Sequence, residues 1–150
     1  MLQLSRKTDY GLRLMLEVAG SAPRSITTEE ASRRQDIPYQ FSRKVVQHLA
    51  ARRLLVSERG FRGGLRLARP AERITLLDIV RSFEPPSLNC CTMDPPRCER
   101  RDVCPVYPVC VEAQRQVERV LGGTRLSDLA ARRARTGRRS GSPALAGAGA

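Results

Sequence analysis

The chain has 150 residues, of which 41% are hydrophobic and only 4% aromatic, with a formal net charge of +12. This length suits one domain whose core is built mostly from Leu, Val, Ile and Ala, as in helical proteins. The single histidine, and the lack of a glycine-rich phosphate loop or a Ser/His/Asp set, argue against an enzyme.

The positive charge lies in two parts of the chain. Residues 1–79 carry +7, residues 80–130 carry zero and the last 20 residues carry +5. A basic N-terminal half predicts a polyanionic partner, which we take to be double-stranded DNA.

No apolar run reaches the roughly 18–20 residues that a membrane span needs, and Arg6, Lys7 and Asp9 interrupt any signal peptide. We therefore expect a cytoplasmic protein without a membrane partner, in which cysteine thiols stay reduced.

Three helices are predicted in the first third of the chain. One covers about residues 5–20. The next begins at Thr27, whose hydroxyl should accept from the Glu30 amide while the Glu30 carboxylate bonds back to Thr27 in a capping box. The third has Pro38 at its first position. Its predicted inner stripe contains Phe41, Val45, Val46, Leu49 and Leu54, and its outer face Tyr39, Gln40, Ser42, Arg43, Lys44 and Gln47. The last two helices are typical of a helix-turn-helix.

A glycine-rich β-hairpin is predicted next. Residues 54–59 and 65–69 form short strand candidates around Gly60-Phe61-Arg62-Gly63-Gly64, whose glycines permit the positive φ angles of a tight tip. Arg59, Arg62 and Arg66 would point from this tip toward phosphate or a minor groove. A helix-turn-helix followed by such a hairpin predicts a mostly α fold with a small β-hairpin wing.

All five cysteines lie between Cys90 and Cys110. Thr75 and Asp78 cap a helix that ends at Pro85-Pro86, where the cysteine-rich stretch opens. After Cys104 a long helix is predicted from the apolar seam Val106, Cys110, Ala113, Val117 and Val120, which favours pairing with its own copy in a homodimer. The seam packing against its own domain is the alternative. A short last helix follows near Leu126, Leu129 and Ala130.

The predicted organisation has four parts. They are a winged helix-turn-helix domain (1–84), a cysteine-rich loop (85–104), a long dimerisation helix with a short C-terminal helix (105–135) and a disordered tail (136–150). Clustered cysteines in a reducing compartment indicate metal binding or redox sensing before disulfides.

Over about residues 1–130 the chain resembles the IscR/NsrR family of winged-helix iron–sulfur transcription regulators. The resemblance rests on residues 4–10 (LSRKTDY), Asp36-Ile37-Pro38, the stretch Arg59–Gly64 and the cysteine loop. It implies a homodimer that binds a near-palindromic promoter site and is switched by a cluster sensing iron, nitric oxide or redox state. Because many members repress, repression is the default expectation.

The resemblance also implies a ligand set. Three cysteines are usual in the family, and their spacing maps them to Cys91, Cys98 and Cys104. Cys90 in place of Cys91, and the set Cys98, Cys104 and Cys110, stay open. Where IscR-like members have a histidine, this chain has Tyr107. Asp9 matches the first-helix aspartate that NsrR-like members donate from the other subunit, and an ordinary first-turn acid is its alternative interpretation.

Three cysteines and one carboxylate favour a [4Fe-4S] cluster, although a [2Fe-2S] cluster needs four ligands as well. DNA contacts are expected from two recognition helices roughly 34 Å apart. The predicted DNA-binding residues are Thr28, Tyr39, Gln40, Ser42, Arg43, Gln47, Arg59 and Arg62. The alternative is a DNA-binding regulator whose cysteines hold zinc or act as a thiol redox switch without a cluster. Zinc is disfavoured by the lack of a Cys-x2-Cys pair.

Overall fold

The computed structural model describes residues 4–58, 60, 63–93 and 98–139. In chain order its helices are α1 (Arg6–Ser21), α2 (Thr28–Arg34), α3 (Tyr39–Ala51), α4 (Leu76–Phe83), α5 (Tyr107–Gly123) and α6 (Leu126–Arg139). Strands β1 (Leu55–Glu58) and β2 (Gly64–Leu67) form an antiparallel hairpin. Three short 3-10 helices lie at Ala71–Arg73, Cys90–Thr92 and Arg101–Val103. The predicted winged helix-turn-helix, mostly helical with one hairpin, is confirmed.

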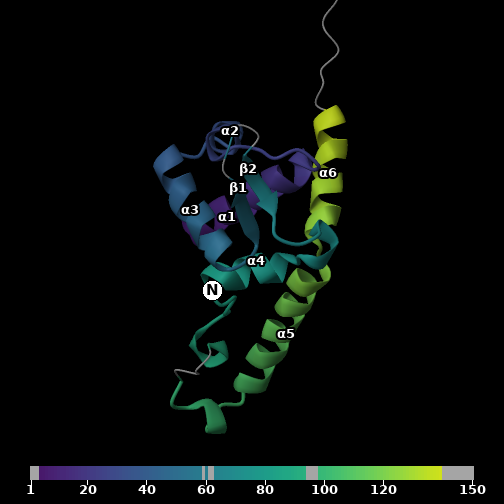
Figure 1. Cartoon of the computed structure of the whole chain (residues 1–150). Helices are drawn as coiled ribbons and strands as arrows, with labels where there is room; N and C mark the ends of the chain where they lie inside the picture. Colours follow the sequence, from purple (N-terminus) through teal and green to yellow (C-terminus); the bar gives the residue numbers. More distant parts are fainter. Residues whose placement is uncertain (1–3, 59, 61–62, 94–97, 140–150) are drawn as a thin grey trace, which may run out of the picture.

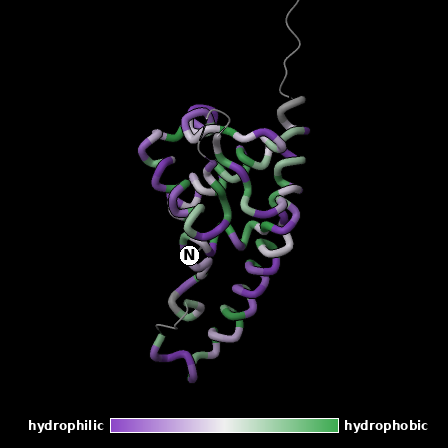
Figure 2. Tube along the Cα trace, in the orientation of Figure 1, coloured by the Kyte–Doolittle hydropathy of each residue, from purple (hydrophilic) through white to green (hydrophobic). Residues whose placement is uncertain are grey.

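The structure has a packed body and a projecting arm. Helices α1 to α4, α6 and the hairpin form the body, from which α5 and the cysteine-rich stretch extend (Figure 1). The core of the body consists of aliphatic side chains that are at most 1% exposed, including Leu14, Met15, Leu49, Ile74, Ile79 and Leu126. The apolar positions of the trace gather in this body, whereas α5 alternates between apolar and polar residues (Figure 2). None of the helices in the described part of the chain combines the length and the hydropathy that crossing a bilayer requires.

Local capping explains where two of the helices begin. Thr75 Oγ1 accepts from the Asp78 amide at 3.1 Å, and Asp78 Oδ2 accepts from the Thr75 amide at 2.9 Å, which forms the capping box that starts α4. At α2 only half of the predicted box forms. Thr27 Oγ1 accepts from the Glu30 amide at 3.1 Å, but the Glu30 carboxylate pairs with Arg34 one turn along the helix.

The wing is tied to the body by backbone bonds. Leu55 pairs with Leu67 and Glu58 with Gly64 across the hairpin. The amide of Leu65 donates to the Ile26 carbonyl at 2.7 Å, which joins the hairpin to the segment before α2. Gly64 has φ 157°, and a Cβ there would lie 2.9 Å from the Ile26 oxygen, so this position requires glycine.

The last helix is longer than predicted. α6 runs from Leu126 to Arg139, so residues 136–139 of the expected disordered tail are helical. Alanine and arginine favour helix, and Arg133 of α6 pairs with Glu17 of α1. This long-range pair could not be read from local pattern.

Glu17 joins three helices through a buried carboxylate. Its side chain is 5% exposed. It accepts from Gln35 Nε2 at 2.6 Å, from Arg34 Nη1 at 3.1 Å and from Arg133 Nη2 at 2.5 Å. Burial raises its pKa, but the hydrogen bonds from Arg133, Gln35 and Arg34 outweigh burial and leave the pKa below its ordinary value.

We predict that Glu17→Gln lowers the free energy of unfolding by about 1–3 kcal/mol at pH 7, because charged hydrogen bonds are lost. A lowered folded-state pKa stabilises the fold above the unfolded-state pKa, and this contribution disappears as pH falls through the folded-state value. Urea unfolding should therefore show the difference between the wild type and Glu17→Gln shrinking below about pH 4. Glu29→Gln, at an exposed acid in the first turn of α2, is the control and should show no such difference. A pH-independent deficit in Glu17→Gln would contradict the electrostatic explanation.

Candidate DNA-binding face and cysteine segment

Helix α3 presents a polar face to solvent. Tyr39, Gln40, Arg43 and Gln47 are all exposed, as predicted for the outer face. The α2–α3 turn fixes where α3 begins: Asp36 has φ 50° and the buried Ile37 donates its amide to the Ser32 carbonyl at 3.0 Å. Pro38 is the N-cap of α3, one position before the predicted one. This face combines a guanidinium, two amides and a phenol, which are groups that read base edges.

The predicted face of α3 was wrong at two neighbouring positions. Ser42 is 0% exposed, so its side chain cannot contact DNA in this fold, and its Oγ has no hydrogen-bond partner. Phe41 was predicted in the core but is 55% exposed. The physical reason is helix geometry: Ser42 lies on the side of α3 that faces the body, whereas Phe41 lies at its edge and meets Tyr10 of α1 edge-on, with ring centroids 6.4 Å apart.

Phe41 and its surroundings are a feature that the sequence alone did not indicate. Its ring lines a groove of about 530 Å³ between α1 and α3, together with Ser5, Arg6, Lys7, Tyr10, Lys44 and Val45. Three cations and two aromatic rings therefore adjoin the polar face of α3. The aromatic residue that follows Tyr39 and Gln40 in sequence was the only available signal, and it suited burial equally well.

The remaining predicted DNA contacts have different surroundings. Thr28 is half-buried at the first position of α2. Arg59 and Arg62, at the tip of the wing, lie outside the described residues. Arg66 does not extend freely from the hairpin, because its Nε lies 3.2 Å from Glu58 Oε2 on the facing strand.

The cysteine segment, residues 85–104, contains a defined turn at Cys90–Thr92. Asn89 Oδ1 accepts from the Cys91 amide at 3.1 Å, and Thr92 Oγ1 accepts from the Asn89 amide at 3.3 Å. Cys98 and Cys104 flank the Arg101–Val103 turn, and Cys104 lies three residues before α5. Cys98, Cys104 and Cys110 are free thiols, and these three and Cys91 are half-buried. The side chain of Cys90 is outside the described structure.

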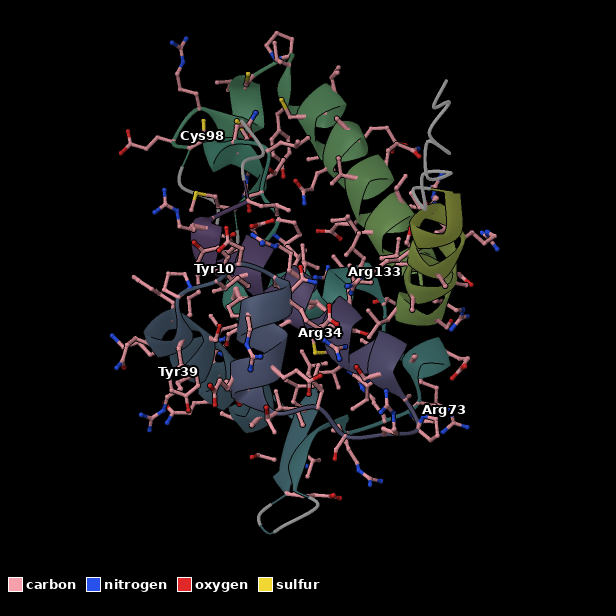
Figure 3. All side chains as sticks on the ribbon, turned by 90° about the horizontal axis from the view of Figure 1, so that it is seen from above. Tyr10, Arg34, Tyr39, Arg73, Cys98 and Arg133 are labelled. Carbon is pink, nitrogen blue, oxygen red and sulfur yellow. The ribbon has the colours of Figure 1, made fainter. Side chains whose placement is uncertain are left out.

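These thiols have the right chemistry for a soft metal, but the described residues of one chain do not assemble a complete site. Within the described residues, no three Cys, His, Asp or Glu side chains are grouped so that they could hold a metal ion. Asp9 has a 54% exposed side chain, and its carboxylate is 3.4 Å from Arg13. Figure 3 shows Cys98 at one end of the molecule and Tyr39 farther along, with Tyr10 between them in this view. An exposed Asp9 is compatible with a ligand that is donated to another copy.

Cys110 and Tyr107 contact the cysteine segment. Asn89 Nδ2 donates to Cys110 Sγ at 3.3 Å, so Cys110 is half-buried against the segment and is not a buried apolar seam residue. Tyr107, which occupies the expected histidine position, lines a cavity of about 270 Å³ with Cys91, Thr92, Met93, Val111, Gln114 and Arg115.

The exposed apolar stripe of α5 is displaced from the predicted seam. Val106, Val109 and Val120 are 57%, 67% and 66% exposed, and Ala113 is exposed between them. Val117 is half-buried and Cys110 bonds to Asn89. The predicted seam was wrong at Cys110, because that side of α5 packs on the cysteine segment. On this side Gln114 accepts from the Leu88 amide at 3.0 Å and donates to the Pro86 carbonyl.

Glu84 anchors the start of the cysteine segment to α1. Its Oε1 accepts from the Ser5 amide at 2.8 Å and from Thr8 Oγ1 at 2.6 Å. Burial raises the pKa of Glu84, but the hydrogen bonds from Thr8 and Ser5 together lower it by more. The pKa is therefore below its ordinary value. The partners are 76 and 79 residues apart in the chain, so no sequence pattern predicted this contact.

Comparison with known proteins agrees with this geometry. The model of the family described as "Rrf2: Iron-dependent Transcriptional regulator" matches residues 4–132. A protein of Mycobacterium tuberculosis (strain ATCC 25618 / H37Rv), named as the helix-turn-helix-type transcriptional regulator Rv1287, is 34% identical over 86 residues. That match covers 57% of this chain and 53% of the relative, so the chain spans about half the length of the curated relatives it matches.

Two solved structures share the fold. CymR, described as the global cysteine regulator of B. subtilis, is 26% identical and superposes with a TM-score of 0.73, covering 87% of this chain and 98% of CymR. IscR of T. potens is 22% identical with a TM-score of 0.72, covering 95% of this chain and 93% of that structure. The resemblance to IscR-like winged-helix regulators is thus confirmed at the level of fold.

Proposed function

This chain belongs to the Rrf2 family of transcriptional regulators, and from this premise we propose that it binds double-stranded DNA as a homodimer and regulates transcription. The observation that carries the proposal is the exposed polar face of α3. This helix is followed in the chain by an arginine-containing hairpin, which is the order of elements in winged-helix DNA-binding domains. The +7 charge of residues 1–79 supplies the phosphate attraction that draws such a face to DNA.

Each exposed residue of α3 has a suitable role. Arg43 can donate two hydrogen bonds to guanine, and Gln40 or Gln47 can pair with adenine in the major groove. The half-buried Thr28, at the start of α2, would contact a phosphate oxygen, which helix N-termini favour. Arg59 and Arg62 complete the proposal as backbone or minor-groove contacts from the wing. A near-palindromic site follows from two-fold symmetry.

The cysteine segment is proposed to be the sensor. Cys91, Cys98 and Cys104 would hold an iron–sulfur cluster, preferably [4Fe-4S], and Asp9 of a second copy would be its fourth ligand. The free thiols of Cys98 and Cys104, the position of Cys91 in the same segment and the exposure of Asp9 support this assignment. When bound, such a cluster supplies a reactive iron that responds to nitric oxide, oxidants or iron shortage.

The role of this chain's residues in the switch is mechanical. The cysteine segment begins at Glu84, which is bonded to the N-terminus of α1, only one turn or less from Asp9. A change in the segment would therefore shift α1 and, in the dimer, the separation of the two α3 helices. Repression is the proposed default, because many members of the family that the chain resembles repress.

A thiol switch without a cluster is the second candidate. The observation in its favour is that Cys98, Cys104 and Cys110 are partly exposed free thiols, of which Cys110 accepts a hydrogen bond from the Asn89 side chain. The fold neighbour CymR is described as a cysteine regulator. Oxidation of two thiols to a disulfide would constrain the same segment.

Metal analysis separates the two candidates. We expect anaerobically purified protein to be brown, with about four iron and four sulfide per chain for a cubane. Cys98→Ser should remove the iron, and Asp9→Ala should leave a cluster that is lost faster in air. Asp128→Ala, at an exposed acid of α6, is the control and should keep the wild-type iron content. A colourless wild-type protein that still binds DNA would refute the cluster and favour the thiol switch.

A further inference from the structure

Within a few residues, the end of α4 contacts α3, which is the proposed recognition helix, and α1, and leads into the cysteine segment. Ser82 and Phe83 form the last positions of α4, and Glu84 follows as its C-cap. Pro85 and Pro86 then open the cysteine segment. This short stretch is therefore continuous in sequence with the cysteine segment and contacts α3 and α1 directly.

Two contacts hold α3 to this stretch. His48 Nε2 lies 2.5 Å from the Ser82 carbonyl, and since a carbonyl only accepts, Nε2 carries the hydrogen. The imidazole also stacks on the Phe83 ring, with centroids 4.6 Å apart and an interplanar angle of 18°. His48 is the only histidine of the chain. It is not among the residues that we propose to contact DNA.

The Phe83 ring is fixed from its other side by α1. A Cβ at Gly11 would lie 2.3 Å from Phe83 Cε2, so the ring rests directly on the α1 backbone and only glycine leaves room for it. Lys7 Nζ lies 5.6 Å from the ring centroid, within cation–π distance. Phe83 therefore cannot change its position without moving against both α1 and His48.

The cysteine segment is attached to the same point. Glu84 is bonded to Ser5 and Thr8 at the start of α1, and Gln114 of α5 holds the backbone at Pro86 and Leu88. Glu84 is joined to Phe83 by one peptide bond, so a displacement of the segment that moves Glu84 also moves Phe83. Because α3 is a rigid helix of 13 residues, a tilt at His48 moves its DNA-facing N-terminal half.

We propose that Phe83 and His48 are positioning residues that couple the state of the cysteine segment to the orientation of the recognition helix. This inference rests on the proposed function, because it names the route by which the sensor acts on α3. The coupling needs no contact between a cysteine and DNA. It requires only that the aromatic pair transmit movement of the α4 end.

Hydrogen exchange measured by mass spectrometry tests the coupling without a known operator. The full-length protein is compared before and after its thiols react with N-ethylmaleimide, and exchange is followed in peptides covering Tyr39–Ala51. In the wild type, modification should change exchange in α3. In Phe83→Leu, and in His48→Gln, which keeps a donor toward Ser82 without the stacked ring, that change should be at least about twofold smaller.

Phe41→Leu is the matched control. It makes the same Phe→Leu substitution at an exposed ring of α3 whose ring contact is with Tyr10 of α1, so it should retain the wild-type response. Thermal unfolding of each variant verifies that the fold is intact before the comparison. A full α3 response in Phe83→Leu, or an equal loss in Phe41→Leu, would overturn the coupling. An absent response in the wild type would overturn both the coupling and the sensing role of the cysteines.

Discussion

Replacing Arg43 by Ala is expected to weaken binding to a selected operator roughly 100-fold, while Ser42→Ala leaves binding unchanged. Arg43 is exposed on the polar face of α3, and loss of a bidentate contact to a base costs about 1–3 kcal/mol per half-site. In a homodimer both half-sites lose the contact, so the two costs add.

The neighbouring serine is the matched control for that prediction. Ser42 is fully buried with an unpartnered hydroxyl, and an unpartnered buried polar group costs about 1–3 kcal/mol. Ser42→Ala should thus raise the free energy of unfolding slightly, as measured by urea denaturation. Fluorescence anisotropy on an operator obtained by in vitro selection measures both affinities. Equal weakening by the two variants would mean that α3 presents a different face to DNA.

The double variant Val109→Glu, Val120→Glu is expected to convert a dimer into a monomer and to weaken operator binding about 100-fold or more. Both valines are about two-thirds exposed in the single chain, and they lie on one stripe of α5 with Val106 and Ala113. An exposed apolar stripe of this length is typical of an interface. Carboxylates placed there would be desolvated and face each other across a two-fold axis.

Sedimentation equilibrium measures the oligomeric state, and anisotropy measures the affinity for the operator. Arg115→Glu places a carboxylate on the opposite, polar side of α5, where the side chain is 70% exposed, and should remain dimeric. If the double valine variant stays a dimer with full affinity, the α5 stripe is not the dimer interface. The free energy of unfolding of the monomer fold should change little, because neither valine is part of the core.

Local sequence patterns determined the elements of this protein. The capping box at Thr75 and Asp78 and the hydroxyl cap at Thr27 depend on neighbours within four residues, so the pattern of residues was sufficient. The order of helices, turn and hairpin then predicted the winged-helix fold. The position of the cysteines before a long helix was also visible in the sequence, as was the exposed Asp9.

The tertiary structure decided which side of each helix is buried. The spacing of apolar residues predicted the wrong burial at Phe41 and Ser42. The small serine fits where α3 packs on the body, and a single exposed phenylalanine is tolerated at the surface. On α5 the stripe moved from Cys110 to Val109, because the cysteine segment folds back on that side. Helical periodicity is compatible with several neighbouring faces, and only the packed partners select one.

The long-range polar contacts were likewise set by the fold alone. Glu17 meets Arg133 across 116 residues, and Glu84 meets Thr8 across 76. The stacking of His48 on Phe83 depends on where α4 ends in space. Such pairs carry no local signature, because their energy comes from burial and from distances between segments that are remote in the chain. The sequence thus determined the family-like arrangement of elements, and packing determined how the cysteine segment is joined to the recognition helix.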